Sequence, residues 1–268
     1  MGNEAFYWTG RAESYLDRPD ATRLDGICVG RYGGSSASGA DKNEDGLLVW
    51  SDGEGRWEFA VILDAHGSCE SAELVIDALL TERPSIESLL SEPVDTAFSG
   101  LESTLLALFR SEAFRSDCAA VKGECSCLIV CRMENYLWWL SVGDCMLFLL
   151  HPELLAWEQS MLNQRNFFEW IGNVNTFDLP VPCYSAGRRQ LREGQHAIVM
   201  ATDGFLDSEG CDVNVMKDWP LRLSGSAREL ERGVLAFLSR LHAARTKDST
   251  TLLVWPVNNP HPGVMPGE

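Results

Sequence analysis

The sequence FAVILDAHGS, residues 59–68, decides how this chain is interpreted. Its apolar run predicts a buried strand over Phe59–Leu63, and the run ends at Asp64, two residues before His66. A strand that ends in this way can simply meet solvent. It can also carry a carboxylate and an acid–base group to the edge of a sheet, where chemistry takes place. The motifs elsewhere in the chain decide between these two interpretations.

Short apolar runs recur along the chain, with helical patterns between them. We expect strands at 47–50, 59–63, 127–131, 136–142, 146–150, 197–201 and 250–255, and helices at 74–80, 94–108 and 230–241. The last helix opens with a capping box of Ser226 and Glu229. Strands joined by tight turns, with helices grouped elsewhere, predict an α+β fold with mostly antiparallel sheets. We expect a single domain over residues 1–255, a flexible loop at 30–40 and a loose Pro- and Gly-rich tail over 256–268.

The composition restricts the partners of the chain. A formal net charge of −17 argues against nucleic acid, because phosphate backbones require Lys and Arg. No apolar run approaches the ~20 residues that span a bilayer, so no membrane contact is expected. The nine cysteines form no C-x-x-C pair, and those in CSCLIVC (125–131) alternate on one strand face. We interpret them as small apolar packing residues in a reducing compartment, which makes the cytoplasm the expected location.

Acidic residues repeatedly border the apolar runs. Their shared feature is a position beside a strand end: Glu44, Asp45, Asp64, Asp144, Asp203 and Asp248. Any single Asp-Gly pair is an ordinary turn, and we expect Asp144 in a type II′ hairpin turn. If the strand ends gather at one edge, so many carboxylates cannot all stay ionised without a cation between them. Oxygen ligands of this kind suit Mg²⁺ or Mn²⁺ and not zinc.

Five motifs in order carry a resemblance to a known family: NED (43–45), ILDAHGS (62–68), LSVGD (140–144), MATDGFLD (200–207) and KDSTTLLVW (247–255). Together they resemble the protein phosphatase 2C family of metal-dependent Ser/Thr phosphoprotein phosphatases, from about residue 26 to 255. The stretch GNVNTF (172–177) is similar to one found in bacterial members. The resemblance implies two antiparallel sheets packed face to face and flanked by helices on both sides, a four-layer αββα arrangement. It also implies a metal centre at one edge of this sandwich.

The resemblance assigns a role to the acids that would bind the first two ions. Asp64 matches the carboxylate that bridges two metal ions, with the carbonyl oxygen of Ala65 on the second ion. Asp203 and Asp248 match the direct ligands of the first ion. The implied cofactors are therefore two Mg²⁺ or Mn²⁺ ions.

The remaining motif residues match supporting roles. Glu44 and Asp45 match acids that act on the metals directly or through bound water, and Asp144 with Asp203 matches a site for a third, weaker ion. Two ions ~3.5–4 Å apart would bridge one water and lower its pKa toward neutrality. The resulting hydroxide would attack phosphorus in line with the leaving seryl or threonyl oxygen. His66 matches the proposed general acid that protonates this oxygen.

Three features depart from the family pattern; one of them, the missing arginine after Asp144 together with Ser249 in place of asparagine, touches no direct metal ligand. Ala65 stands where most relatives have glycine, and a carbonyl ligand tolerates this change if the backbone there is not restricted to glycine conformations. Ala40 stands where many relatives carry an arginine that binds the substrate phosphate. Lys42 and Arg31 are the candidates to replace that arginine, and the sequence does not choose between them.

The sequence thus predicts a Mg²⁺- or Mn²⁺-dependent phosphatase that acts on phosphorylated serine or threonine in a protein substrate. The departures at Ala40 and Ala65 suggest an alternative, a non-catalytic relative that binds phosphorylated or regulatory partners. A phosphatase for small phosphate esters is a further alternative. The sequence carries no signal for an oligomeric state.

Overall fold

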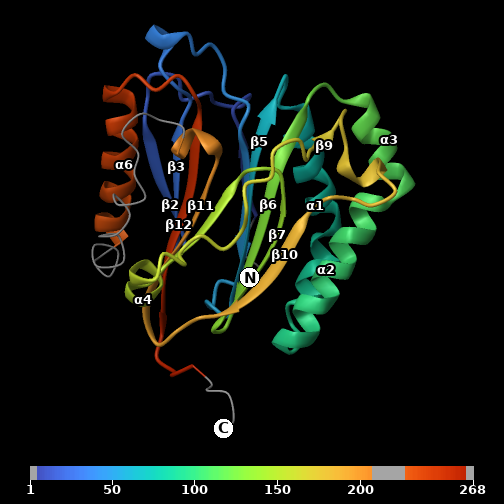
Figure 1. Cartoon of the computed structure of the whole chain (residues 1–268), viewed down its shortest axis with the longest axis vertical. Coiled ribbons are helices and arrows are strands. Elements are labelled where there is room, and N and C mark those ends of the chain that lie inside the picture. The colour runs from blue at the N-terminus through green and yellow to red at the C-terminus, as the bar shows by residue number, and fades with distance from the viewer. Residues whose placement is uncertain (1–4, 207–226, 264–268) are drawn as a thin grey trace. The chain divides into compact units, whose positions relative to one another are not determined.

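The computed structural model describes residues 5–206 and 227–263 of the chain. Within these residues the chain forms two antiparallel sheets, and each sheet with its helices belongs to a compact unit (Figure 1). Unit 1 comprises residues up to 13, 44–145 and 165–188, and unit 2 comprises 14–43, 146–164 and the residues from 189 onward. The predicted α+β class and the antiparallel sheets are confirmed. The single domain expected over residues 1–255 stays a prediction.

The sheet of unit 1 has seven strands in the order β1-β4-β5-β6-β7-β10, with β9 paired to β6. The strands are β1 (Phe6–Thr9), β4 (Gly46–Ser51), β5 (Trp57–His66), β6 (Glu124–Met133), β7 (Tyr136–Val142), β9 (Ile171–Gly172) and β10 (Ser185–Gln190). β5 and β6 share the longest ladder of this sheet, from Trp57 opposite Met133 to His66 opposite Glu124. The strand predicted from FAVILDAHGS is therefore a central strand.

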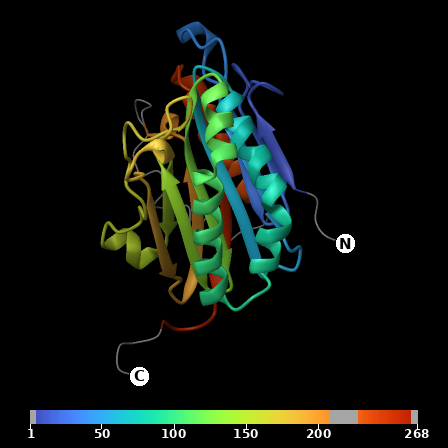
Figure 2. The ribbon, with the colours of Figure 1, turned by 90° about the vertical axis from the view of Figure 1, so that its right-hand side faces the viewer.

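Three helices cover one face of this sheet: α1 (Glu70–Leu89), α2 (Val94–Arg110) and α3 (Glu112–Ala120). Figure 2 shows α1 and α2 side by side along the strands. Alternate residues of β5 and β6 point into the core beneath the helices, among them Val61, Leu63 and Cys127. The prediction that the cysteines of CSCLIVC pack as small apolar residues on one strand face is confirmed.

Helix α1 is longer than the sequence suggests. We expected a helix over 74–80, whereas α1 extends to Leu89 and contains Pro84. A proline inside a helix costs about 3 kcal/mol, because it removes one backbone hydrogen bond and crowds the preceding turn. The helix continues because Ile86, beyond the proline, is fully buried in the same core as Leu79. Tertiary packing thus overrides the local signal to stop.

The sheet of unit 2 has five strands in the order β2-β3-β12-β11-β8. Its elements are β2 (Asp20–Leu24), β3 (Ile27–Tyr32), β8 (Met146–Leu150), β11 (Gly194–Ala201), β12 (Thr250–Asn259) and the helices α4 (Pro152–Ala156) and α6 (Ala227–Ala243). Helix α6 packs on β2 and β3 through an apolar stripe that includes Leu230, Val234 and Leu241 (Figure 1). The helical spacing predicted for residues 230–241 is confirmed. Ser226, the predicted cap, lies outside the described residues.

The expected hairpin around Asp144 is wrong. β7 pairs with β6 in one sheet and β8 pairs with β11 in the other, so the short connection at Asp144 changes sheets. The loop expected at 30–40 is also wrong in its first part, because Gly30–Tyr32 is the buried end of β3. Pairing with β2 on one side and β12 on the other holds this glycine-containing segment in a strand that its local sequence does not favour.

The first residues of the expected tail belong to a strand, because β12 continues past residue 255 to Asn259. β3 pairs with β12 only as far as Val254, whereas β11 pairs with it along Leu252–Asn259. One side of the strand therefore has no ladder partner at Pro256, and a residue that lacks an N–H group is tolerated there. Among the described helices, none is long and apolar enough to cross a membrane.

Candidate functional site

Two of the predicted acids lie side by side at the ends of β4 and β5. The ladder between these strands ends with Gly46 opposite Leu63, which places Asp45 next to Asp64. Because Leu63 belongs to the core under the helices, alternation points the side chains of Asp45 and Asp64 to the opposite face. Both are buried, with 1% and 5% of their surface exposed.

A third acid is attached to the same place through a serine. Ser126 lies directly opposite Asp64 in the β5–β6 ladder, and its hydroxyl donates a 2.6 Å hydrogen bond to Oδ1 of Asp144. Gly143 allows this approach: it has a φ of +87°, and a Cβ atom there would lie 2.3 Å from the Ser126 Oγ. The connection between β7 and β8 thus packs against β6 and brings Asp144 to the ends of the other strands.

The negative charges of these three acids affect the pKa of the Cys145 thiol. Burial raises the pKa of its thiol well above the usual value, and the charges of Asp64, Asp144 and Asp45 raise it further. A thiol with a raised pKa stays protonated at neutral pH and is a poor metal ligand. The thiol of Cys145 therefore does not compete with the neighbouring carboxylates for a cation.

His66 lies at the end of this arrangement. The prediction that β5 ends at Leu63 is wrong, because β5 continues to His66. The His66 side chain is 52% exposed, its Nδ1 lies 3.6 Å from Oδ1 of Asp64, and its ring meets the ring of Trp170 at a centroid distance of 5.4 Å. Ala65 has the ordinary extended backbone of a strand, and the positive φ of this segment falls on Gly67. The alanine at position 65 is therefore compatible with a ligand carbonyl.

Glu44 differs from its neighbour Asp45. Glu44 lies two residues before the start of β4 and is half-buried, whereas Asp45 is fully buried. Burial raises the pKa of the Cys69 thiol, and the charge of Glu44 contributes to the increase. Glu44 thus lies near the start of α1.

The two acids predicted in unit 2 flank a close backbone contact. β11 ends and β12 begins side by side, and a Cβ atom on Gly204 would lie only 2.0 Å from the carbonyl oxygen of Ser249. Asp203 precedes Gly204, and Asp248 precedes Ser249, so the contact brings the two acids to neighbouring points of the unit. Asp203 is half-buried, whereas Asp248 is exposed and accepts a 3.0 Å hydrogen bond from the N–H of Ser249.

The two candidates for binding phosphate have different environments. Arg31 is 5% exposed, lies 4.5 Å over the ring of Tyr15 and donates a 2.5 Å hydrogen bond to Asp20. Its positive charge is thus already matched by a carboxylate. Lys42 is exposed. Of the two, Lys42 is the better placed to meet a phosphate group from solvent.

The chemistry of the donor set fits a hard divalent cation. Carboxylate oxygens are the ligands that Mg²⁺ and Mn²⁺ prefer. Asp45 and Asp64 of unit 1 face the same side of one sheet, and Asp144 is hydrogen-bonded to Ser126 opposite Asp64. Within residues 5–206 and 227–263, no three His, Cys, Asp or Glu side chains are already grouped closely enough to hold a metal ion. These carboxylates therefore do not form a complete ligand set as they stand, and binding a cation would require them to move closer together.

Three residues near these acids were not predicted from the sequence: Ser126, Arg165 and Trp170. Ser126 had a detectable signal, because it alternates with Cys125 and Cys127 and must point to the face opposite theirs. Arg165 and Trp170 are contributed by an irregular segment, and Arg165 lies 3.7 Å from Asp144. No periodic pattern marks such positions.

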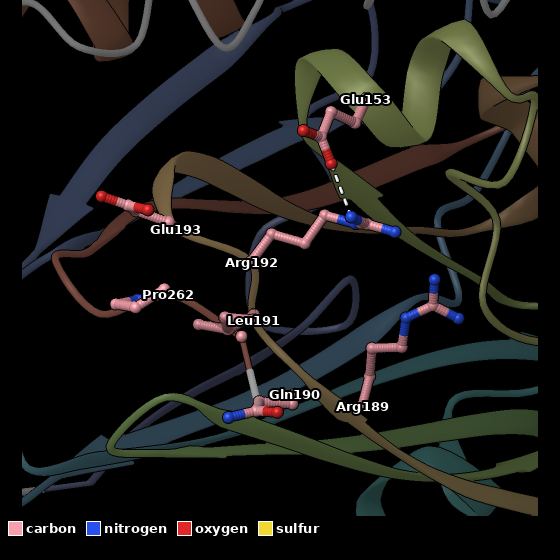
Figure 3. Close-up of a pocket in the computed structure, with 8 residues that line it drawn as sticks. Glu153, Arg189, Gln190, Leu191, Arg192, Glu193 and Pro262 are labelled. Atoms are coloured by element: carbon pink, nitrogen blue, oxygen red, sulfur yellow. Dashed lines mark hydrogen bonds and ion pairs between the residues drawn. The ribbon is translucent and has the colours of Figure 1, made fainter. Parts of the chain in front are cut away.

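A cavity in unit 2 contains none of the predicted site residues. Its volume is about 600 Å³, and it is lined by Glu153, Arg189–Glu193, Pro262 and Gly263. Figure 3 shows Arg192 paired with Glu153 above the cavity and Arg189 extending along one side. Its walls carry two arginines and two glutamates, so their charges balance and select no ligand class.

Solved structures provide the comparison, since neither protein-family models nor curated proteins match this sequence. The serine/threonine phosphatase Stp1 from Staphylococcus aureus superposes with a TM-score of 0.62 at 13% identity, covering 90% of this chain and 98% of its own. The catalytic domain of the serine/threonine phosphatase PstP in complex with two manganese ions gives 0.55 at 15% identity, covering 95% and 99%. RsbX in complex with magnesium gives 0.53 at 14% identity, covering 89% and 100%.

The chain has the fold of the bacterial PP2C-type serine/threonine phosphatases. The PP2C fold predicted from five short motifs is confirmed at an identity too low for the sequences themselves to be matched. Two of these neighbours hold Mg²⁺ or Mn²⁺ in their structures, and the named phosphatases are hydrolases.

Proposed function

We propose that this chain is a Mg²⁺- or Mn²⁺-dependent phosphatase that hydrolyses phosphoserine or phosphothreonine in protein substrates. One observation carries the proposal: Asp45 lies next to Asp64 at the ends of β4 and β5, and Ser126, opposite Asp64, is hydrogen-bonded to Asp144. Carboxylates gathered at the end of strands are expensive to keep ionised unless a cation neutralises them. The PP2C fold supports the same conclusion, since neighbours with this fold are phosphatases.

Some residues of unit 1 are proposed to bind the cations, and one is proposed to transfer a proton. Asp64 and the carbonyl of Ala65 are proposed ligands, and Asp45 supports them. When bound, two hard cations would activate the attacking water and offset the negative charge of the phosphoryl group. His66, exposed and 3.6 Å from Asp64, is proposed to donate a proton to the leaving oxygen.

The other proposed ligands come from the remaining strand ends. Asp203 and Asp248 of unit 2 are proposed to bind the first cation, and Glu44 to act through water. Asp144 is proposed to share a third, weaker ion with Asp203. Lys42 is the candidate for contact with the substrate phosphate, because the guanidinium of Arg31 is already paired with Asp20.

Activity assays with a matched control test the proposal. The wild-type protein should hydrolyse p-nitrophenyl phosphate and a phosphoserine peptide in Mn²⁺, and a chelator should abolish both reactions. Asp64→Asn and Asp203→Asn should reduce turnover to the level without metal. Asp52→Asn is the control: Asp52 belongs to the same unit, but its carboxylate accepts backbone hydrogen bonds in a turn with Arg56 and should not affect turnover.

Metal binding can be measured without activity. A ligand that binds only the folded state raises its stability, so Mn²⁺ should increase the Tm of the wild type and of Asp52→Asn but not of Asp64→Asn. A wild type that binds Mn²⁺ without hydrolysing either substrate would contradict the proposal. It would instead favour a non-catalytic protein that binds phosphorylated partners.

A further inference from the structure

The segment of residues 165–170, here called the 165–170 loop, is attached to the candidate site at both ends. The N–H of Asn166 donates a 3.0 Å hydrogen bond to the carbonyl of Gly143, and the backbone of Gly143 is bonded in turn to the carboxyl group of Glu169. At the other end, Trp170 meets the ring of His66. All of these residues belong to unit 1, so their arrangement is fixed within one compact body.

Arg165 gives the loop a positive charge beside the acids. Its Nη2 lies 3.7 Å from Oδ2 of Asp144, beyond hydrogen-bond distance, whereas Arg31 donates a 2.5 Å hydrogen bond to Asp20. The guanidinium of Arg165 lies 5.2 Å from the centre of the Phe167 ring. Only 20% of this side chain is exposed, so it is held in place. A guanidinium held in this way attracts an anionic group on a chain whose overall charge of −17 repels anions.

Two aromatic side chains of the loop extend into solvent next to this charge. Phe167 is 59% exposed and Phe168 is 90% exposed. Phe168 has a φ of +71°, a conformation that is rare for a bulky side chain and that carries a cost in conformational energy. Folding alone gives no reason to hold an aromatic ring in solvent in a strained conformation. A binding surface does, because large rigid aromatic groups provide much of the energy of recognition.

We propose that the 165–170 loop selects phosphorylated peptides with a large apolar residue next to the phosphorylated serine or threonine. Phe167 and Phe168 contact that apolar side chain, while Arg165 attracts the phosphorylated segment to the acids. The inference rests on the proposed function and names its substrate class. It makes these two phenylalanines specificity-determining residues rather than catalytic ones, and it excludes small esters as the preferred substrates.

Peptide pairs and one small substrate test this directly. The peptides carry one phosphoserine and differ only in its two neighbours, which are leucine in one and serine in the other. The wild type should have the lower KM for the leucine peptide. Phe168→Asn should raise that KM about tenfold, the effect of about 1.4 kcal/mol of lost contact, without changing kcat. The KM for p-nitrophenyl phosphate, which has no neighbouring residues, should not change.

The choice of asparagine separates recognition from folding. Asparagine adopts a positive φ more readily than phenylalanine, so Phe168→Asn should be at least as stable as the wild type in urea unfolding. Tyr7→Ser is the matched control, because Tyr7 is also an exposed aromatic residue of unit 1 but lines a cavity beside α1. This control should retain the preference for the leucine peptide.

The possible failures are distinguishable. Equal KM values for the two peptides, or a preference that persists in Phe168→Asn, would overturn the inference while leaving the phosphatase activity intact. Absence of turnover on every substrate would overturn the proposed function instead. In that case fluorescence anisotropy of labelled peptides decides the inference: tighter binding of the leucine peptide that is lost in Phe168→Asn supports it, and equal binding refutes it.

Discussion

The hydroxyl of Ser126 lies 2.6 Å from Oδ1 of Asp144 and donates a hydrogen bond to it, although 18 residues separate them. Because Ser126 also faces Asp64 across the β5–β6 ladder, one small side chain connects two of the proposed ligands. The position of Asp144 thus depends on a strand that contributes no ligand of its own.

We expect Ser126→Ala to lower the free energy of unfolding by about 1.5–3 kcal/mol, because a hydrogen bond to a buried charged group is lost. Mn²⁺ should also raise the Tm of this variant by less than it raises that of the wild type. Urea unfolding with and without Mn²⁺ measures both effects. Ser103→Ala, on an exposed helix surface, should change the free energy by less than about 0.5 kcal/mol. An equal, small effect of both substitutions would show that the Ser126–Asp144 contact is unimportant.

Two glycine-to-alanine substitutions in unit 2 should have opposite effects. A Cβ atom at Gly204 would overlap the carbonyl oxygen of Ser249, so Gly204→Ala should cost about 1–3 kcal/mol and separate Asp203 from Asp248. Gly233 lies in α6, and a Cβ atom there would meet no atom within 4 Å beyond the adjoining backbone of the helix, so Gly233→Ala should stabilise the protein by up to about 1 kcal/mol. Thermal unfolding of the two variants compares them. Destabilisation by both would contradict the close contact at Gly204.

A buried histidine pair should make the protein acid-sensitive. His151 and His196 stack at a centroid distance of 4.6 Å, and His196 is only 1% exposed. Burial, reinforced by His151, lowers the pKa of His196 to about 4. The unfolded chain therefore takes up a proton at this residue near pH 6.5, whereas the folded chain does so only near the lower value.

It follows that the free energy of unfolding should fall as the pH drops from about 6.5 toward 4, by up to about 3 kcal/mol from this group. His196→Phe keeps a ring against His151 but cannot take up a proton, so its stability should decrease less over that range. Urea midpoints at pH 7, 6 and 5 give the two slopes. Identical slopes for the wild type and the variant would show that His196 does not titrate in this way.

Cysteine reactivity should follow burial. Cys183 is exposed, whereas Cys125, Cys127 and Cys131 are buried and have thiol pKa values raised by burial. Iodoacetamide at neutral pH should label Cys183 rapidly and the three strand cysteines only after unfolding. Mass spectrometry of the labelled peptides checks this. Rapid labelling of the strand cysteines in the native protein would contradict their role as packing residues.

Much of the secondary structure could be predicted because its signal is local. The strands over Tyr136–Val142 and Met146–Leu150 have the predicted bounds, and α2 begins at the predicted Val94. The hairpin between the two strands could not be rejected from sequence, because a short turn looks the same whether its strands pair with each other or with different sheets. The length of α1 was missed for a similar reason, since burial of Ile86 outweighs the local effect of Pro84.

The sequence by itself determined the PP2C fold, through acids beside strand ends that stand in the order of that family. This pattern can be recognised in the sequence because each acid directly borders its strand in the chain. Only the tertiary structure decided that Asp45 lies next to Asp64, and that Ser126, opposite Asp64, holds Asp144 by a hydrogen bond. The register of the strands and the sheet to which each strand belongs decide which acids are neighbours. Both depend on packing between side chains that are distant in the sequence.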